Sequence, residues 1–188
     1  MASDNNIKTV SITDPQTKRE VYTSSLTNMR GSGFYGFQDT QYIGANKLLI
    51  SEDNQTKLTF TNPSFVKDKR PQIGNTFYDM YDFTQQTIVT YPEFEDGIYR
   101  VRLQFVAENV TAASGQGIRV SLYSPSGGFS LDRNTVALIK GSGVPQRVRE
   151  VFTFYSDTLT DSGLEVRITP LNGDVRVYNA NLLITANM

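Results

Sequence analysis

From Lys47 onward, hydrophobic and polar residues alternate in short runs that are rich in Val, Ile, Thr, Tyr and Phe. These runs are separated by Gly, Asn, Asp, Ser and Pro, which favour turns. No stretch of eleven or more residues keeps a 3.6-residue period, so the pattern predicts strands and no long helix. We expect eight to ten strands, at residues 47–51, 57–61, 87–91, 97–107, 117–123, 135–140, 146–155, 164–169 and 174–185, the last of which could divide near Asn179.

The run 97–107 shows the alternation most clearly. One of its faces carries Arg100, Arg102 and Gln104. Its other face is apolar and is predicted to lie in the core: Tyr99, Val101, Leu103 and Phe105. Because successive side chains of a strand point to opposite sides of a sheet, one apolar face per strand indicates antiparallel sheets packed against each other.

Many short strands without intervening helices predict an all-β fold, an antiparallel β-sandwich. We expect a jelly roll, which is the commonest way to arrange eight such strands, while an immunoglobulin-like sandwich stays open. The sandwich should span residues 31–188. Residues 1–30 are polar and are predicted to form an extended N-terminal arm that buries too little apolar surface to order by itself. A neighbouring subunit could hold this arm in place.

Two segments between predicted strands contain sequence signals for a turn or a loop. The segment "PLNGDV", residues 170–175, contains an Asn-Gly pair that fits a tight type I′ hairpin between two strands. The segment "NPSFVKDKRPQIGN", residues 62–75, has two prolines and a cluster of Lys67, Lys69 and Arg70. This composition indicates a long exposed connection, and such loops are often contact surfaces.

Composition narrows the function. The 188 residues include 18 basic and 19 acidic ones, a formal net charge of -1, so we expect neither nucleic acid nor an anionic membrane as a partner. The chain has no His and no Cys, which removes the Ser-His-Asp triad, cysteine nucleophiles and the usual zinc ligand sets. Its longest apolar run is Val136–Ile139, too short for a signal peptide or a membrane span. We therefore expect a soluble protein made without a cleaved leader.

Few candidate catalytic or metal-binding residues remain. Glu93 and Glu95 would lie roughly 7 Å apart on one face of an extended backbone, a separation between those of retaining and inverting glycosidases. A solvated acidic turn explains them more simply. The loops 51–57 and 155–163 concentrate oxygen ligands but lack the EF-hand spacing, so turn-forming Asp is the favoured interpretation there. We expect no enzymatic activity, no cofactor and no metal.

Two aromatic-rich segments, residues 33–42 and 76–83, could contact a ligand. If Tyr35 and Tyr78 are exposed, their rings could stack on sugars; if they are buried, they belong to the core or to an interface. Packing is favoured, because a chain of this size has to bury its aromatic residues.

The arginines concentrate in the predicted strands after residue 97 and form the candidate interface: Arg100, Arg102, Arg119, Arg147 and Arg149. Arg pairs bidentately with carboxylates and is enriched at protein interfaces. The alternative is pairing within the sheet, which would need no partner and would use Glu150, Glu165 and Asp174. The residues leave both open.

The sequence from about residue 86 to 186 resembles the jelly-roll domains of bacteriophage virion proteins and, more distantly, carbohydrate-binding-module-like sandwiches. The resemblance lies in an Asp-Gly-x-Tyr strand opening at 96–99, a late "DSGLEVRI" strand and a final "VRVYNANLLI" strand. It implies a non-enzymatic structural protein of the virion, made in the host cytoplasm. The role implied is capsid decoration or cement, as a homo-oligomer bound to capsid or tail proteins, with a tail or fibre component or a glycan-binding module as the alternatives.

Overall fold

The computed structural model describes residues 29–30, 33–73, 76–91, 97–111, 115–155 and 163–187, without the side chains of 29–30, 65–68 and 72–73. All regular structure in this part is β-strand and every strand pairing is antiparallel, which confirms the all-β prediction. No helix in it is long and apolar enough to cross a membrane. The strands are β1 (Met29–Arg30), β2 (Gly33–Asp39), β3 (Leu48–Ile50), β4 (Thr56–Lys57), β5 (Pro63–Lys69), β6 (Gln72–Ile73), β7 (Thr76–Phe77), β8 (Tyr81–Asp82), β9 (Thr87–Ile88), β10 (Ile98–Asn109), β11 (Gly117–Ser124), β12 (Phe129–Ala137), β13 (Gln146–Tyr155), β14 (Glu165–Leu171) and β15 (Val175–Asn187).

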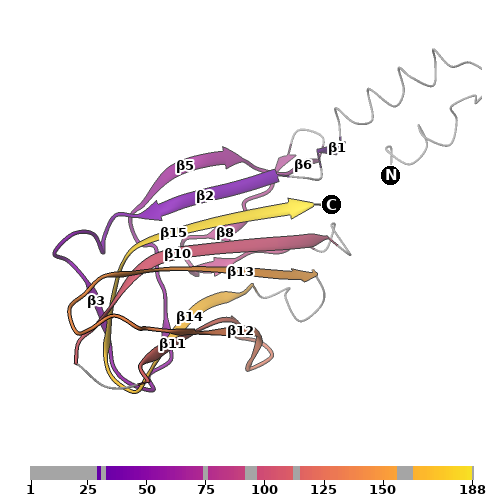
Figure 1. The fold of residues 1–188 in the computed structure, drawn as a ribbon. Coiled ribbons are helices and arrows are strands. Elements are labelled where there is room, and N and C mark those ends of the chain that lie inside the picture. The colour runs from indigo at the N-terminus through magenta and orange to yellow at the C-terminus, as the bar shows by residue number, and fades with distance from the viewer. Residues whose placement is uncertain are drawn as a thin grey trace, which may run out of the picture.

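Two sheets form the sandwich (Figure 1). The larger sheet has the order β13-β10-β15-β2-β5, with β3 paired to the end of β15, and it occupies the upper part of the view. The smaller sheet has the order β12-β11-β14-β4. Short pairings of β6 with β1 and β7, and of β8 with β9, complete the fold. Because strands adjacent in a sheet are mostly distant in the chain, long-range pairing determines this jelly roll.

The core lies between the two sheets. Tyr99, Val101, Leu103 and Phe105 of β10 are fully buried, as their alternation predicts. Aromatic rings fill the end of the core under β2, where Phe37 packs edge-on against Phe60 with 5.0 Å between ring centroids. Such aromatic pairs add about 0.5–1.5 kcal/mol beyond the area that they bury.

The segment 62–75 is not the exposed connection that its composition predicts. Most of it forms β5 and β6, and β5 pairs with β2 as the edge of the larger sheet. Pro63 begins β5 and lies opposite Asp39. A proline at the start of an edge strand costs no essential ladder hydrogen bond, and lysines are common on such edges, so both signals fit a strand here.

The Asn-Gly pair does not make a hairpin. Asn172 and Gly173 have the positive φ angles that the pair favours, 58° and 127°, but β14 and β15 belong to different sheets. The turn therefore leads from one layer to the other. The strand ends instead bond to other segments, since Asp53 N–H donates to Pro170 O and Val110 N–H donates to Asp174 O.

Candidate functional site

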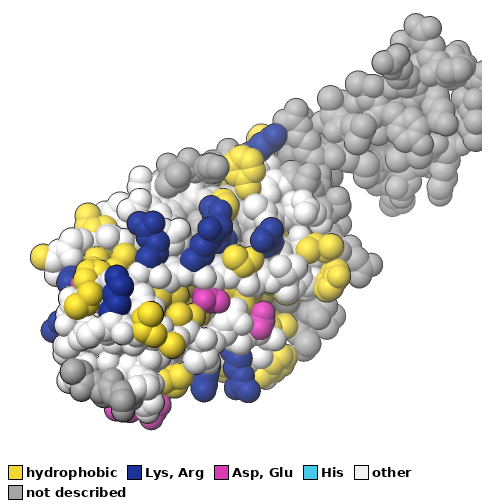
Figure 2. All heavy atoms as spheres, in the orientation of Figure 1, with side chains coloured by type: hydrophobic (Ala, Val, Ile, Leu, Met, Phe, Trp, Pro, Cys, Tyr) yellow, Lys and Arg dark blue, Asp and Glu magenta, His cyan; other side chains and the backbone are white. Residues whose placement is uncertain are grey.

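The outer face of the larger sheet carries the candidate site. Arg100 and Arg102 of β10 are exposed on it, because their neighbours in the strand point into the core. Arg149 lies opposite Gln104 and Arg147 opposite Val106, so β13 presents both arginines on the same face. In Figure 2, Lys and Arg side chains gather over the strands of this sheet. We call the set Arg100, Arg102, Arg147 and Arg149 the arginine band.

The spacing of the arginine band follows from the register. Arg100 and Arg102 are two residues apart in one strand, which places their Cα atoms about 7 Å apart. Arg149 is a diagonal neighbour of Arg102, at about 7–8 Å. Within the described part of the chain, no arginine side chain of the band takes part in a hydrogen bond or an ion pair. The band is thus a concentrated positive charge that the described side chains do not neutralise.

Acidic residues are nearly absent from this face. Among the outward positions of β13, β10 and β15, the only acid is Glu108, and it is 3% exposed. Its carboxylate accepts hydrogen bonds from Lys47 Nζ at 2.7 Å and from Tyr178 OH at 2.6 Å. We call these three residues the Glu108 cluster. It fixes Lys47, which precedes β3, against the end of β10.

The contacts of the Glu108 cluster set its electrostatics. Burial alone would raise the pKa of the Glu108 carboxyl, but the hydrogen bonds from Lys47 and Tyr178 outweigh it and hold that pKa below its ordinary value. Burial and the neighbouring carboxylate raise the pKa of Tyr178 to about 12. Glu108 is therefore ionised and already paired with Lys47 and Tyr178, so it does not neutralise the arginine band.

The acids proposed for pairing within the sheet lie elsewhere. Glu150 is opposite the core-facing Leu103, so it points away from the band and accepts a hydrogen bond from Asn134 Nδ2 at 2.9 Å. Asp174 accepts one from the backbone N–H of Glu52 at 2.9 Å. Glu165 belongs to the smaller sheet. None of the three neutralises the arginine band.

Arg119 does not join the arginine band. It lies on β11, opposite Thr135 and Thr169, in the smaller sheet. Arg119 was predicted to belong with the other four arginines because its strand shows the same alternation. Alternation does not determine which sheet a strand joins. The structure therefore divides the five candidate arginines into four on one sheet and one on the other.

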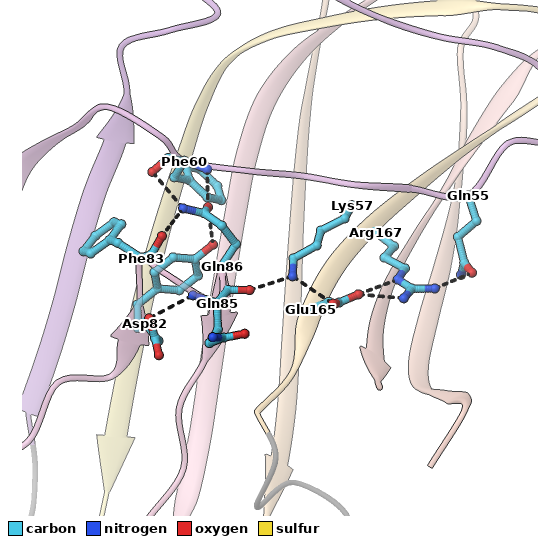
Figure 3. A network of polar contacts seen from close by, with 10 residues as sticks. Gln55, Lys57, Phe60, Asp82, Phe83, Gln85, Gln86, Glu165 and Arg167 are labelled. Carbon is cyan, nitrogen blue, oxygen red and sulfur yellow. Dashed lines mark hydrogen bonds and ion pairs between the residues drawn. The ribbon is translucent and has the colours of Figure 1, made fainter. Parts of the chain in front are cut away.

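On the smaller sheet, the charges are paired (Figure 3). Lys57 Nζ donates to Glu165 Oε1 at 2.8 Å and to the carbonyl of Gln85 at 2.7 Å. Arg167 Nε donates to Glu165 Oε2 at 2.7 Å, and its guanidinium carbon lies 3.4 Å from the centroid of the Tyr123 ring. Burial would raise the pKa of Glu165, but these hydrogen bonds lower it overall. The network joins β4, β14 and the 83–86 turn, and both of its cations contact the same carboxylate, Glu165.

The aromatic candidates differ in position. Tyr35 is 4% exposed and packs against Phe37 at 5.8 Å between centroids, so it belongs to the core, the alternative that the sequence favoured. The reason is that β2 points Tyr35 into the core. Tyr78 is half-buried and packs edge-on against Tyr91 at 4.8 Å.

The remaining candidates give no catalytic or metal centre to build on. Glu93, Glu95, most of the 155–163 loop and the predicted arm except Met29–Arg30 lie outside the described residues. Within the described residues, no group of three or more Asp or Glu could hold a metal ion.

Comparison with known proteins shows the fold. No family model and no curated protein matches the chain. The chain is similar to the solved structure of Eiger TNF from S. frugiperda, with a TM-score of 0.53, 11% identity, and coverage of 85% of this chain and 94% of that one. It also matches the globular domain of zebrafish complement 1qA protein, with a TM-score of 0.44, 12% identity, and 83% and 96% coverage.

Viral capsid proteins are among the structural neighbours. One is VP2 of the infectious bursal disease virus subviral particle, with a TM-score of 0.30, 8% identity, and coverage of 81% of this chain and 56% of that one. Likenesses with a TM-score below 0.5 carry no argument about function. At 11% identity, the likeness to Eiger TNF shows the fold alone, a jelly-roll β-sandwich.

Proposed function

We propose that this protein is a non-enzymatic structural protein that binds copies of itself and an acidic protein surface through the outer face of its larger sheet. The single observation that supports this proposal is the arginine band: four exposed arginines on two adjacent strands, with no partner in the described chain and no available acid beside them. In the free protein this arrangement is unfavourable, because like charges repel. An acidic partner would turn the same charges into bidentate ion pairs.

Apolar side chains flank the arginine band. Ile98 and Tyr155 lie opposite one another at one end of the face and are 38% and 64% exposed. Leu49 of β3, opposite Arg176, is 55% exposed near the other end. Arg together with aromatic and aliphatic residues, and few acids, is the composition that distinguishes protein interfaces from the remaining surface.

The larger sheet also provides a rigid platform. β10 and β15 are paired on both sides, and their inner residues are buried in the core. Side chains on such a framework lose less backbone entropy on binding than side chains on a loop would lose. A basic face on such a framework suits contact with a repeating surface.

The setting that we propose is a virion, with decoration or cement of the capsid as the role. This step rests on the resemblance of residues 86–186 to phage virion jelly-roll domains, and a tail or fibre component would use the same face. Copies of this chain and capsid or tail proteins are then the partners.

Sedimentation velocity of the full chain tests the proposal. The variant Arg147→Glu/Arg149→Glu should weaken self-association by at least about tenfold, which corresponds to about 1.4 kcal/mol. The matched control, Arg119→Glu/Arg133→Glu, makes the same charge change on the smaller sheet and should leave self-association unchanged. Raising the salt concentration should weaken the wild type toward the variant, because the Debye length falls from about 10 Å at 0.1 M to 3 Å at 1 M.

Binding to particles tests the virion role. Virions that lack the protein should bind added wild-type protein to saturation in a co-sedimentation assay and should bind the β13 variant much less. A chain that is monomeric at all concentrations, and whose deletion leaves the virions unchanged in composition and stability, would rule out the proposal.

A further inference from the structure

A shallow depression opens on the outer face of the larger sheet, beside the arginine band. Its volume is about 180 Å³ and it crosses β2, β15 and β10. Its lining residues are Gly36, Phe37, Arg102, Gln104, Asn181, Leu182 and Leu183. Sites for whole small molecules measure about 300–1,000 Å³, so this depression has the size for a single side chain or a comparable group.

Gly36 lines the depression. It occupies an outward position of β2, opposite Leu183, where any other residue would place a side chain on the face. A Cβ atom at Gly36 would come within 2.8 Å of Leu183 Cδ1. The β2–β5 register also shifts between Gly36 and Phe37. The side chain of Leu183 therefore lies over Gly36, and the depression opens beside this contact.

Hydrogen-bond donors surround the hollow on one side. Arg102 lies opposite Leu183, and Gln104 lies opposite Asn181. In the part of the chain that the structure describes, neither Arg102 nor Gln104 makes a side-chain hydrogen bond or ion pair. Asn181 Nδ2 donates to Asn179 O at 3.1 Å, which leaves its second N–H available. One guanidinium and two amides thus converge beside an apolar wall.

A guanidinium and two amides beside an apolar side chain favour a carboxylate on a short aliphatic stem. The planar guanidinium of Arg102 matches a carboxylate in a forked pair, the amides can donate to the same oxygens, and Leu183 can pack against the stem. We propose that the depression binds the side-chain carboxylate of a Glu or Asp residue on a partner protein. This inference rests on the proposed function, because it names the group by which the acidic surface is held.

A blocked peptide, acetyl-Gly-Glu-Gly-amide, serves as the probe, with the full-length protein observed by ¹⁵N NMR. The peptide should shift the backbone signals of Gly36, Leu183 and Gln104 in a saturable way, and acetyl-Gly-Gln-Gly-amide should bind at least about tenfold more weakly. Arg102→Ala should abolish the shifts. Arg102→Lys, which keeps the charge but loses the fork, should weaken binding several-fold. The dispersion of each variant's own spectrum shows that it is folded.

Arg176→Ala is the matched control, since it removes the same charge from β15 on the outer face of the same sheet, outside the arginine band and without touching the depression. It should leave the affinity for the Glu peptide unchanged. A loss equal to that of Arg102→Ala would mean that the peptide senses diffuse charge, and the inference would be overturned. Equal binding of the Glu and Gln peptides, or binding of N-acetylneuraminic acid in place of the Glu peptide, would overturn it too.

The two proposals fail separately. If Arg147→Glu/Arg149→Glu disrupts self-association but the Glu peptide does not bind at Gly36, the carboxylate site is wrong and the proposed function stands. If the peptide binds in an Arg102-dependent way but the β13 variant assembles normally, the site stands and the proposed function is wrong.

Discussion

Lys47 and Glu108 form an ion pair with 2.7 Å between Nζ and Oε2, although Glu108 is only 3% exposed. Tyr178 donates to the other oxygen of the same carboxylate. A buried carboxylate without partners costs several kcal/mol, so these two contacts are what allow an acid at the end of β10. The pair also ties two segments that are 61 residues apart in the chain.

Lys47→Met should lower the free energy of unfolding by about 2 kcal/mol, between the value for an exposed ion pair and that for a fully buried one. The reason is that Glu108 keeps its charge but loses a partner. Urea denaturation monitored by fluorescence measures the change. Lys140→Met is the control, because Lys140 is exposed and donates only to Pro145 O, and its effect should stay within about 0.5 kcal/mol.

Acid should destabilise the fold through Glu108 and Glu165. Both have a folded-state pKa below the ordinary value of 4.5. Their contribution to stability is therefore complete above that pH and is lost as the pH falls through the lower folded-state pKa. Urea midpoints measured at steps between about pH 6 and 2.5 should fall steeply for the wild type and less steeply for Glu108→Gln/Glu165→Gln. Parallel curves would show that other carboxyls control acid unfolding.

The strands that the sequence predicts best are those whose pattern is local. The run 146–155 coincides with β13, and the buried face of β10 is as expected, because alternation within one strand depends on its own residues. β2 was not predicted, because its glycines and aromatic residues give no clear alternating pattern. In the structure it is a strand that pairs with β15 and β5. Likewise, the Asn-Gly turn has the expected φ angles but joins strands whose partners lie elsewhere.

The features of the candidate site also divide into those that local alternation predicts and those that depend on long-range strand pairing. The outward direction of Arg100, Arg102, Arg147 and Arg149 could be predicted from alternation. The separation of Arg119 onto the other sheet, the pairing of Glu108 with distant Lys47, and the hollow over Gly36 all depend on which strands become neighbours. That information is long-range, and no local pattern in this chain contains it.

The last predicted strand, 174–185, was expected to divide near Asn179, and the conformation of Asn179 explains the irregularity that the structure has there. β15 runs on to Asn187, but its register with β10 shifts opposite Asn179, whose φ is 53°. The left-handed region costs a residue with a Cβ about 1–2 kcal/mol, and least for Asn and Gly. Asn179→Gly should therefore keep or slightly raise the thermal midpoint.

Asn179→Val should lower the free energy of unfolding by at least about 1–2 kcal/mol, because a β-branched residue tolerates positive φ poorly. Asn187→Val, at an exposed position of the same strand without positive φ, is the control and should change it by less than about 0.5 kcal/mol. Equal losses in the two valine variants would show that the bulge imposes no strain at Asn179.

The two sheets should respond differently when an arginine is removed from the free chain. Arg167→Ala removes a guanidinium that pairs with Glu165 and stacks on Tyr123, so it should cost about 1–2 kcal/mol of unfolding free energy. Arg149→Ala should cost less than about 0.5 kcal/mol, or stabilise the monomer, because it relieves repulsion within the arginine band. Urea denaturation at low and high salt separates the two effects, since screening should abolish any gain from Arg149→Ala. A loss for Arg149→Ala as large as that for Arg167→Ala would mean that the arginine band stabilises the fold itself and is not kept for an interface.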